Sequence, residues 1–272
     1  MNNFFVSKHI LFQYRISENI ETVDLRSHCH STYEILFVTK GKNNFLVENS
    51  TYQIADNSLI IIPPGIYHTL QNASQNEYER YIIYFVSDLL PPFLHIGESL
   101  HIFASEDIKN IFLKLYKYLQ QFNTETFYSL LISALTELLI LATHLKNTDV
   151  SFSQQPLDPP ALIGQTLNFI NENLDNPISL DAIAARLFVS KSYLCHVFQR
   201  YMKISVMKYI RSKKMMRAHA LLQNGMSHTQ VAQLLHYDTY LTFLRQYRAE
   251  FHCNPSQKEI VSKMIENDFL KE

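Results

Sequence analysis

Cysteine and glycine are both scarce in this sequence, and each shortage excludes a kind of site. Only three cysteines, Cys29, Cys195 and Cys253, occur among the 272 residues, and no two of them form a CxxC pair. A small, odd and widely spaced set predicts neither a disulfide framework nor a zinc finger, and it suits a reducing cytoplasm. Because the chain has only five glycines, no glycine-rich phosphate-binding loop is visible, and no Ser-His-Asp grouping stands out.

Long apolar runs are missing as well. No stretch of 18 apolar residues is free of charge, and the nearest, residues 127–145, contains Glu137 and several hydroxyl groups. The first residues, MNNFFVSKHILFQYR, lack the uninterrupted apolar run of a signal peptide. We therefore expect a soluble, cytoplasmic protein without a membrane partner.

The net charge of -1 conceals an uneven distribution. Residues 1–160 carry 10 Lys and Arg against 16 Asp and Glu, whereas residues 161–258 carry 12 against 5. An acidic half joined to a basic half indicates that only the second half meets a polyanion. The alternative, a basic surface that is merely solvated, is weaker because the basic residues cluster with two pairs of helices.

The first helix pair is predicted over residues 179–201, where the helical period continues on both sides of a short turn. Ser179 and Ser190 are good N-caps for the two helices, and the small Ala184 lets the helices cross closely. This is a helix-turn-helix, whose second helix is shaped to enter a DNA major groove. Its outward face carries Lys191, Ser192, Cys195, His196, Gln199 and Arg200.

The same pattern returns over residues 227–251. Ser227 is a cap, and Val231 and Ala232 follow it at the offsets at which Ile183 and Ala184 follow Ser179. The turn is one residue longer in this second unit. Two such units in one chain are a stronger signal than one helix pair. The outward face of the second recognition helix offers Tyr240, Leu241, Thr242, Arg245, Gln246 and Arg248.

Residues 162–258 contain the pieces ISLDAIAARL, VSKSYLCHVFQRY, MMRAHALL, SHTQVAQLL and FLRQYRAEF followed by Asn254-Pro255. Together they resemble the DNA-binding region of the AraC/XylS family of bacterial transcription regulators. The resemblance implies that a stiff helix at 208–222 holds the two recognition helices in successive major grooves, about 34 Å apart. It also implies double-stranded promoter DNA and RNA polymerase as partners.

The resemblance further implies which side chains meet DNA. Arg245 is the strongest candidate for reading a base, because a guanidinium can take guanine O6 and N7 together. Gln199 could pair with adenine or equally touch the backbone. The expected base contacts are Ser192, Cys195, His196, Gln199, Tyr240, Leu241, Thr242 and Arg245. The expected phosphate contacts, for whose lysines a solvated surface charge is the alternative, are Lys191, Arg200, Lys213, Lys214 and Arg248.

Three family glycines are replaced in this sequence. His236 stands before the aromatic turn residue Tyr237, His252 follows the second recognition helix, and Lys203 occupies the matching place after the first. Glycine favours a positive φ, so we expect mild backbone strain at all three residues.

Residues 1–100 are typical of many short strands separated by turns, which suggests a barrel or jelly roll. The clearest strands are 34–39, 45–48, 59–62 and 81–86, which are rich in β-branched and aromatic residues. The spacing of His28-Cys29-His30, Glu34, Gly41, Pro63-Pro64-Gly65, His68 and Asn72 resembles the two motifs of a cupin, with Thr22 and Asn57 in place of the leading glycines.

In metal-using cupins the matching ligands would be His28, His30, Glu34 and His68. The numbers 28, 30 and 34 are all even, so these residues would share one strand face, and their imidazoles and carboxylate suit a divalent transition metal. Regulators of the resembled family commonly keep such a pattern for an organic effector or for packing alone. We therefore favour an effector pocket, with no cofactor required and the metal as the alternative. The pocket residues are Arg15, His28, His30, Glu34, His68 and Tyr84.

Residues 105–146 change to the helical period, with one helix at 107–122 and a second at 125–146. The second is apolar on more than one face, and in the resembled family this region carries the dimer contact. Coverage of the barrel by both helices is the competing interpretation, and we favour a homodimer.

The sequence thus predicts an α+β protein of two domains. A cupin-like β-barrel (1–104) with a helical pair (105–146) is joined by a linker (147–160) to an all-α domain (161–272) with helix-turn-helix motifs at 179–201 and 227–251. The expected function is DNA-binding transcription regulation, with activation favoured because it is the commoner role in the family. The expected protein is not an enzyme. A metal-dependent cupin enzyme and a regulator controlled by a protein partner remain the alternatives.

Overall fold

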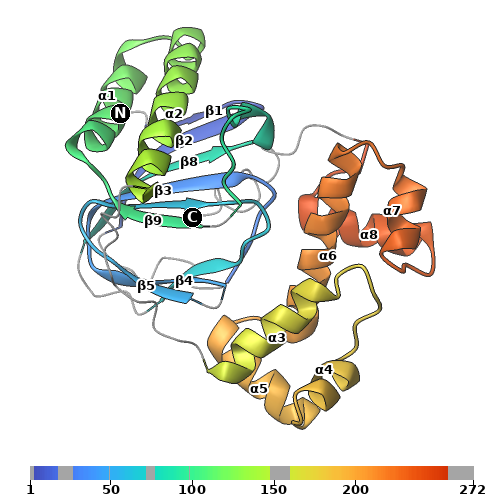
Figure 1. Cartoon of the computed structure of the whole chain (residues 1–272). Helices are drawn as coiled ribbons and strands as arrows, with labels where there is room; N and C mark the ends of the chain where they lie inside the picture. Colours follow the sequence, from blue (N-terminus) through green and yellow to red (C-terminus); the bar gives the residue numbers. More distant parts are fainter. Residues whose placement is uncertain are drawn as a thin grey trace.

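The computed structural model describes residues 3–17, 27–48, 50–71, 77–97, 99–147 and 160–256. Within them a sheet-rich N-terminal part is followed by a helical C-terminal part (Figure 1), which confirms the predicted α+β architecture. Residues 148–159 of the predicted linker lie outside the described residues, as do residues 257–272 of the predicted DNA-binding domain. Two positions of the cupin comparison, Thr22 and Asn72, lie outside them too.

Two antiparallel sheets build the barrel. A six-stranded sheet has the order β1-β2-β8-β3-β6-β9, and a three-stranded sheet has the order β5-β4-β7. The four strands expected from composition are confirmed as β3, β4, β6 and β8. The strands are β1 (Phe4–Val6), β2 (Ile10–Ser17), β3 (Tyr33–Lys40), β4 (Asn43–Val47), β5 (Ser50–Ile54), β6 (Ser58–Ile62), β7 (His68–Gln71), β8 (Tyr78–Phe85) and β9 (Leu100–Phe103), with a 3-10 helix at Ser87–Leu89.

The inner strands of the six-stranded sheet, β2, β8, β3 and β6, are buried on both faces, and their alternate residues go to different cores. On β3, Leu36 and Val38 join residues of β4, β5 and β7 in the barrel interior, whereas Ile35 and Phe37 lie under the helical pair. This period of two places Glu34 on the interior side. The interior of the barrel is therefore the side on which a buried polar site can form.

The helical pair covers the outer face of the six-stranded sheet (Figure 1). It consists of α1 (Glu106–Gln121), capped by the Ser105 side chain, and α2 (Thr124–Asn147). By length and composition α2 could cross a membrane, but Phe127, Leu131 and Leu138 are buried in the core shared with the sheet. Most of the apolar surface that we associated with a dimer is thus buried within a single chain. Ile140, 41% exposed, is the largest exposed apolar side chain on α2.

The C-terminal part consists of six helices among the described residues. Ser179, Ser190 and Ser227 each accept a backbone N–H with their side chains, so the three caps predicted from the sequence are confirmed. Thr239 caps the last helix in the same way. The helices are α3 (Ala161–Glu172), α4 (Leu180–Arg186), α5 (Lys191–Met202), α6 (Val206–Gln223), α7 (His228–Leu234) and α8 (Tyr240–Phe251).

Helix α6 belongs to the cores of both helix-turn-helix units. Tyr209 and Ile210 pack with α3, α4 and α5, whereas Met215 and Ala218 pack with α7 and α8. One continuous helix therefore sets the relative orientation of α5 and α8, as the sequence predicted for the segment 208–222.

Candidate functional site

Helix α5 presents the outward face that the sequence predicted. Ser192, His196 and Gln199 are exposed, whereas Leu194 and Phe198 are buried against α4 and α3. Cys195 is half-buried and packs at the edge of that core, so its thiol is the least accessible of the four expected base contacts on this helix.

Helix α8 repeats this arrangement. Tyr240, Leu241 and Arg245 are exposed, and Leu241 is 75% exposed although it is apolar. Thr242 is half-buried because its hydroxyl lies 3.0 Å from that of the cap residue Thr239. An exposed guanidinium and an exposed apolar side chain on one helix face suit a guanine edge and a thymine methyl group.

Three of the five expected phosphate contacts lie on the surface of the two units. Arg200 is exposed at the end of α5. Lys191 pairs with Asp181 at 2.9 Å, and Arg248 donates to the side chain of Asn254 at 2.6 Å. The Lys191–Asp181 ion pair is exposed, where such a pair contributes only about 0–1 kcal/mol, and the Arg248–Asn254 hydrogen bond is exposed as well, so both cations can exchange their partners for phosphate at little cost.

The other two lysines are occupied inside the protein. Lys213 Nζ lies 3.0 Å from Glu48 Oε1 of the barrel, and Lys214 Nζ donates to the carbonyl oxygens of Asn176 and Leu235. Phosphate contact by either lysine remains a prediction, and it requires that the lysine leave these partners.

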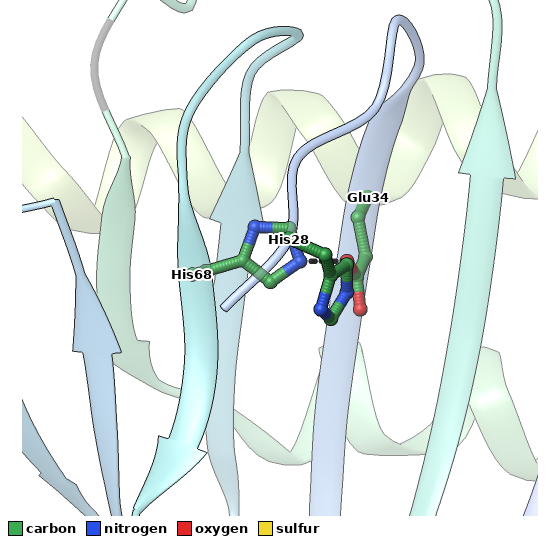
Figure 2. A group of neighbouring side chains, drawn as sticks. All are labelled: His28, Glu34 and His68. Carbon is green, nitrogen blue, oxygen red and sulfur yellow. Dashed lines mark ion pairs between the residues drawn. The ribbon is translucent and has the colours of Figure 1, made fainter. Parts of the chain in front are cut away.

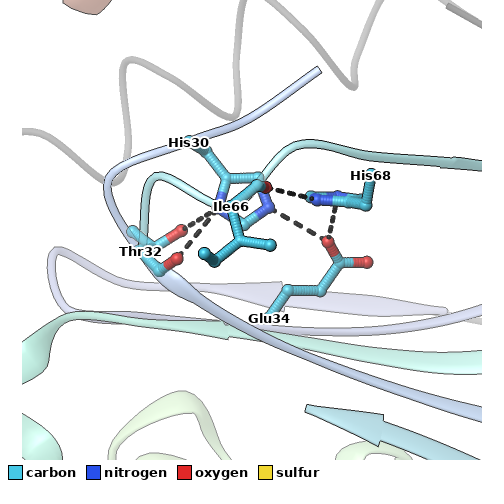
Figure 3. Close-up of polar contacts among 5 residues, drawn as sticks. All are labelled: His30, Thr32, Glu34, Ile66 and His68. Carbon is cyan, nitrogen blue, oxygen red and sulfur yellow. Dashed lines mark hydrogen bonds and ion pairs between the residues drawn. The ribbon is translucent and has the colours of Figure 1, made fainter. Parts of the chain in front are cut away.

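The second candidate site is a histidine cluster inside the barrel, formed by His28, His30, Glu34 and His68. Ligand atoms of His28, Glu34 and His68 all lie within 4.8 Å of one another (Figure 2). Glu34 Oε2 is 3.0 Å from His30 Nε2 and 2.9 Å from His68 Nε2 (Figure 3). Glu34 and His68 are buried, whereas His28 is exposed, so the cluster meets solvent on the His28 side.

The strand argument used for these residues was wrong in detail. Glu34 lies on β3, but His28 and His30 precede that strand, and a bend at Ser31 and Thr32 separates them from it. The cluster forms instead because His28 pairs its backbone with His68, the first residue of β7. Convergence of the four side chains is thus a result of the fold around the barrel mouth rather than of a period of two.

The backbone fixes the protonation of two imidazoles. His30 Nδ1 lies 2.9 Å from the carbonyl oxygen of Thr32, and His68 Nδ1 lies 2.9 Å from that of Ile66 (Figure 3). A carbonyl oxygen only accepts hydrogen bonds, so both Nδ1 atoms must carry the proton. In the neutral rings both Nε2 atoms then direct lone pairs at Glu34.

The surroundings of Glu34 favour its charged form. Burial alone would raise the pKa of Glu34, but the charges and hydrogen bonds of His68 and His30 outweigh it and hold the pKa well below its usual range. Burial and the neighbouring Glu34 carboxylate raise the pKa of Tyr84 well above 10. The cluster is therefore a carboxylate with imidazoles around it and a neutral phenol beside it.

Two sequence profiles match the chain in order. A profile of the AraC-like ligand binding domain matches residues 13–140, and a profile of a helix-turn-helix domain matches residues 183–258. The chain belongs to the AraC family. The AraC-family chain is accordingly a DNA-binding transcription regulator with a ligand-binding N-terminal domain.

Relatives of this AraC-family chain include two regulators of Escherichia coli (strain K12). The putative HTH-type transcriptional regulator YkgA is 27% identical over 110 residues, which are 40% of this chain and only 46% of YkgA. The HTH-type transcriptional regulator YdiP is 24% identical over 263 residues, 90% of this chain and 85% of YdiP. Among solved structures, an apo ToxT variant from Vibrio cholerae aligns with a TM-score of 0.43 and 12% identity over 93% of this chain and 97% of that one.

Sequence reasoning missed one buried cation of the AraC-family barrel. Arg80 on β8 is buried, donates to Ser17 Oγ at 3.0 Å and lies over the ring of Tyr78, 4.5 Å from its centroid. Arg15 lies opposite Arg80 in the register of β2 and β8. The positive charges of Arg15 and Arg80 both act to lower the pKa of Tyr84, against the larger effect of burial. Alternation along β8 could have found it, because Arg80 and Tyr84 are both even-numbered and face the interior.

Proposed function

We propose that this AraC-family regulator binds a specific promoter sequence with α5 and α8 and acts as an activator under the control of a small-molecule effector in the barrel. The observation that carries the proposal is the pair of capped helices with exposed polar and basic faces, joined by the single helix α6. RNA polymerase is the expected further partner, and the cytoplasm is the expected location. The histidine cluster is proposed as a binding site and not as a catalytic centre.

Arg245 provides the sharpest test of base reading. Replacing it with alanine removes the guanidinium proposed to take a guanine edge, so discrimination between the cognate site and random DNA should fall by about 1–3 kcal/mol. The measurement is a fluorescence anisotropy titration of both DNAs, after footprinting upstream of neighbouring genes has located the site. Equal losses on the two DNAs would show that Arg245 only holds phosphate. Arg200→Ala is the control, because a phosphate contact should weaken both DNAs alike.

A homodimer through α2 is retained as part of the proposal. Its support is the exposed Ile140 on the outer face of the helical pair, together with Leu113 of α1. Sedimentation of the full chain with and without target DNA tests it. A monomer at micromolar concentration under both conditions would contradict the dimer.

A divalent transition metal is the second candidate for the effector, and the protonation of His30 and His68 favours it. Metal-bound histidines usually donate their other ring N–H to a carbonyl or carboxylate, which is the arrangement of both rings here. Three imidazoles and one carboxylate are a donor set for zinc, cobalt or nickel. The residues that would hold the ion are His28, His30, Glu34 and His68.

Binding of the ion alone can be measured without knowledge of the DNA target. We expect Co²⁺ to give a visible ligand-field spectrum with one equivalent per chain, and His68→Ala to abolish it. His101→Ala is the matched control, because His101 is also largely buried but lies on β9 against Tyr52. Absence of the spectrum in the wild-type protein, or its survival in His68→Ala, would leave the organic effector as the proposal.

A further inference from the structure

The barrel contacts the connecting helix α6 through one charged pair. Glu48, which directly follows β4, places Oε1 3.0 Å from Lys213 Nζ, and Tyr209 donates its hydroxyl to Oε2 at 2.6 Å. The side chains of Glu48 and Lys213 are only 16% and 11% exposed. A charge pair this far from solvent is costly to break on one side alone, because the remaining charge loses its partner.

Apolar packing surrounds this pair. The rings of Tyr67 and Tyr209 lie 4.6 Å apart between centroids, and both are almost fully buried. Lys213 donates a second hydrogen bond, 3.0 Å long, to the carbonyl oxygen of Gly65. Leu46 of β4 and Tyr67 belong to the same buried cluster as the core of the first helix-turn-helix unit. The contact is therefore continuous with that core and is more than a surface ion pair.

The backbone positions Glu48 for this role. Its N–H donates to the carbonyl oxygen of Tyr67 at 2.7 Å, and Tyr67 N–H donates back to Glu48 Oε1 at 3.2 Å. Glu48 also has a positive φ of 50°, a conformation that costs a residue with a Cβ about 1–2 kcal/mol and needs support from its surroundings. The carboxylate is thus held toward α6 before Lys213 approaches it.

Lys213 cannot serve this contact and a DNA phosphate together, because two of its donors and its charge are directed at Glu48 and Gly65. We propose that the Glu48–Lys213–Tyr209 contact is an autoinhibitory latch. The barrel withholds Lys213 from DNA, and release of the contact returns this cation to the DNA-binding surface. The inference rests on the proposed DNA-binding function and adds the regulation of it.

Affinity of the full chain for its DNA site tests the latch through four variants. Glu48→Gln removes the charge but keeps the shape, so it should tighten DNA binding, on the order of tenfold. Tyr209→Phe removes one hydrogen bond to Glu48 and should tighten binding less. Lys213→Met opens the latch too but removes the proposed phosphate contact, so it should bind DNA more weakly than Glu48→Gln and lower the slope of log K against log salt by about 1. The double variant should match Lys213→Met alone, since Glu48 acts only through Lys213.

Glu77→Gln is the matched control, because Glu77 forms an exposed ion pair with Lys40 on the barrel and should not change DNA binding. Unchanged DNA affinity in Glu48→Gln would overturn the latch. So would a loss of affinity in Glu48→Gln equal to that in Lys213→Met, which would show a scaffold that DNA binding needs intact. Thermal unfolding of each variant identifies any that fails to fold. A wild-type protein that binds no DNA would instead refute the proposed function.

Discussion

Lys203, the C-cap residue of α5, has a backbone conformation that suits glycine. Its φ is 58°, and the matching residue after α8, His252, has a φ of 53°. A residue with a Cβ in this left-handed region is destabilised by about 1–2 kcal/mol. Replacement by glycine removes this strain, but glycine also raises the entropy of the unfolded chain, so the net gain in stability is smaller. We expect Lys203→Gly to raise the free energy of unfolding by about 0.5–1 kcal/mol in urea titrations.

Lys208→Gly exchanges the same two residue types, but we expect it to lower the free energy of unfolding. Lys208 lies inside α6, where glycine costs about 1 kcal/mol relative to a good helix former. If both variants were destabilised alike, the left-handed conformation of Lys203 would not be a source of strain.

His219 makes the stability of the second helix-turn-helix unit depend on pH. Its Nδ1 lies 2.8 Å from the hydroxyl of Tyr247, and burial lowers the pKa of His219 to about 4 from 6.5. Between these two values the unfolded chain binds a proton that the folded chain does not, so stability falls as the pH drops through that window. We expect His219→Gln to lose less stability between pH 7 and pH 5 than the wild type does, by on the order of 1–2 kcal/mol.

The control for this titration is His144→Gln, because His144 is exposed on α2. Chemical denaturation at several pH values measures both variants. A pH dependence that is identical in the wild type and in His219→Gln would show that His219 is not the group responsible.

At the scale of single residues, sequence reasoning succeeded where the determinant is local. The three non-glycine residues at glycine positions, Lys203, His236 and His252, were expected to be strained, and all three have a positive φ. Asn57, which replaces a leading cupin glycine, does so as well, with a φ of 66°. These positions were identified through the resemblance to the two families, whose glycines mark points where the backbone takes a positive φ.

Helix α6 acts as a strut between the two reading units. Lys214 Nζ donates to the carbonyl oxygen of Asn176, before α4, at 3.0 Å and to that of Leu235, after α7, at 3.2 Å. Arg217, one turn further along, makes two hydrogen bonds to Asp175, of 3.1 and 2.9 Å. One face of α6 thus holds the loop before α4 and the turn between α7 and α8.

The variant Lys214→Met distinguishes a structural role of Lys214 from contact with a DNA phosphate. Removal of the ammonium leaves two carbonyl oxygens without this donor, so the unfolding free energy should fall by about 1–3 kcal/mol. The slope of log K for DNA against log salt should stay unchanged. A slope lower by about 1, without a loss of stability, would assign Lys214 to phosphate after all. Arg200→Met, at an exposed site, should show that second pattern.

Elements were predictable to different degrees for one physical reason. The helices of both units were found with their caps because a helix is built from contacts three and four residues apart. Strands β1, β2, β5, β7 and β9 were not found, because a short strand is stabilised by pairing across the sheet rather than by contacts within its own few residues, as the full-length pairing of β2 with the distant β8 shows. The intramolecular contacts of Lys213 and Lys214 could not be predicted either, since their acceptors lie far away in the sequence.

At the scale of the whole molecule, four consecutive residues, 65–68, connect the histidine cluster to α6. Gly65 accepts from Lys213, Ile66 accepts from His68 Nδ1, Tyr67 packs on Tyr209, and His68 itself belongs to the cluster. Gly65 N–H also donates to the carbonyl oxygen of His30 at 2.8 Å. The proposed effector site and the contact with α6 therefore share the segment 65–68.

Linkage between the two sites follows from this shared segment. If an ion in the cluster changes the affinity for DNA by some factor, DNA must change the affinity for the ion by the same factor. We expect Co²⁺ titrations with and without target DNA, and DNA titrations with and without Co²⁺, to give one common ratio on the order of 5–100-fold. In Glu48→Gln both ratios should approach one, because the latch that joins the sites is open in either state. A ratio that survives in Glu48→Gln would show that the coupling does not pass through the Glu48–Lys213 contact.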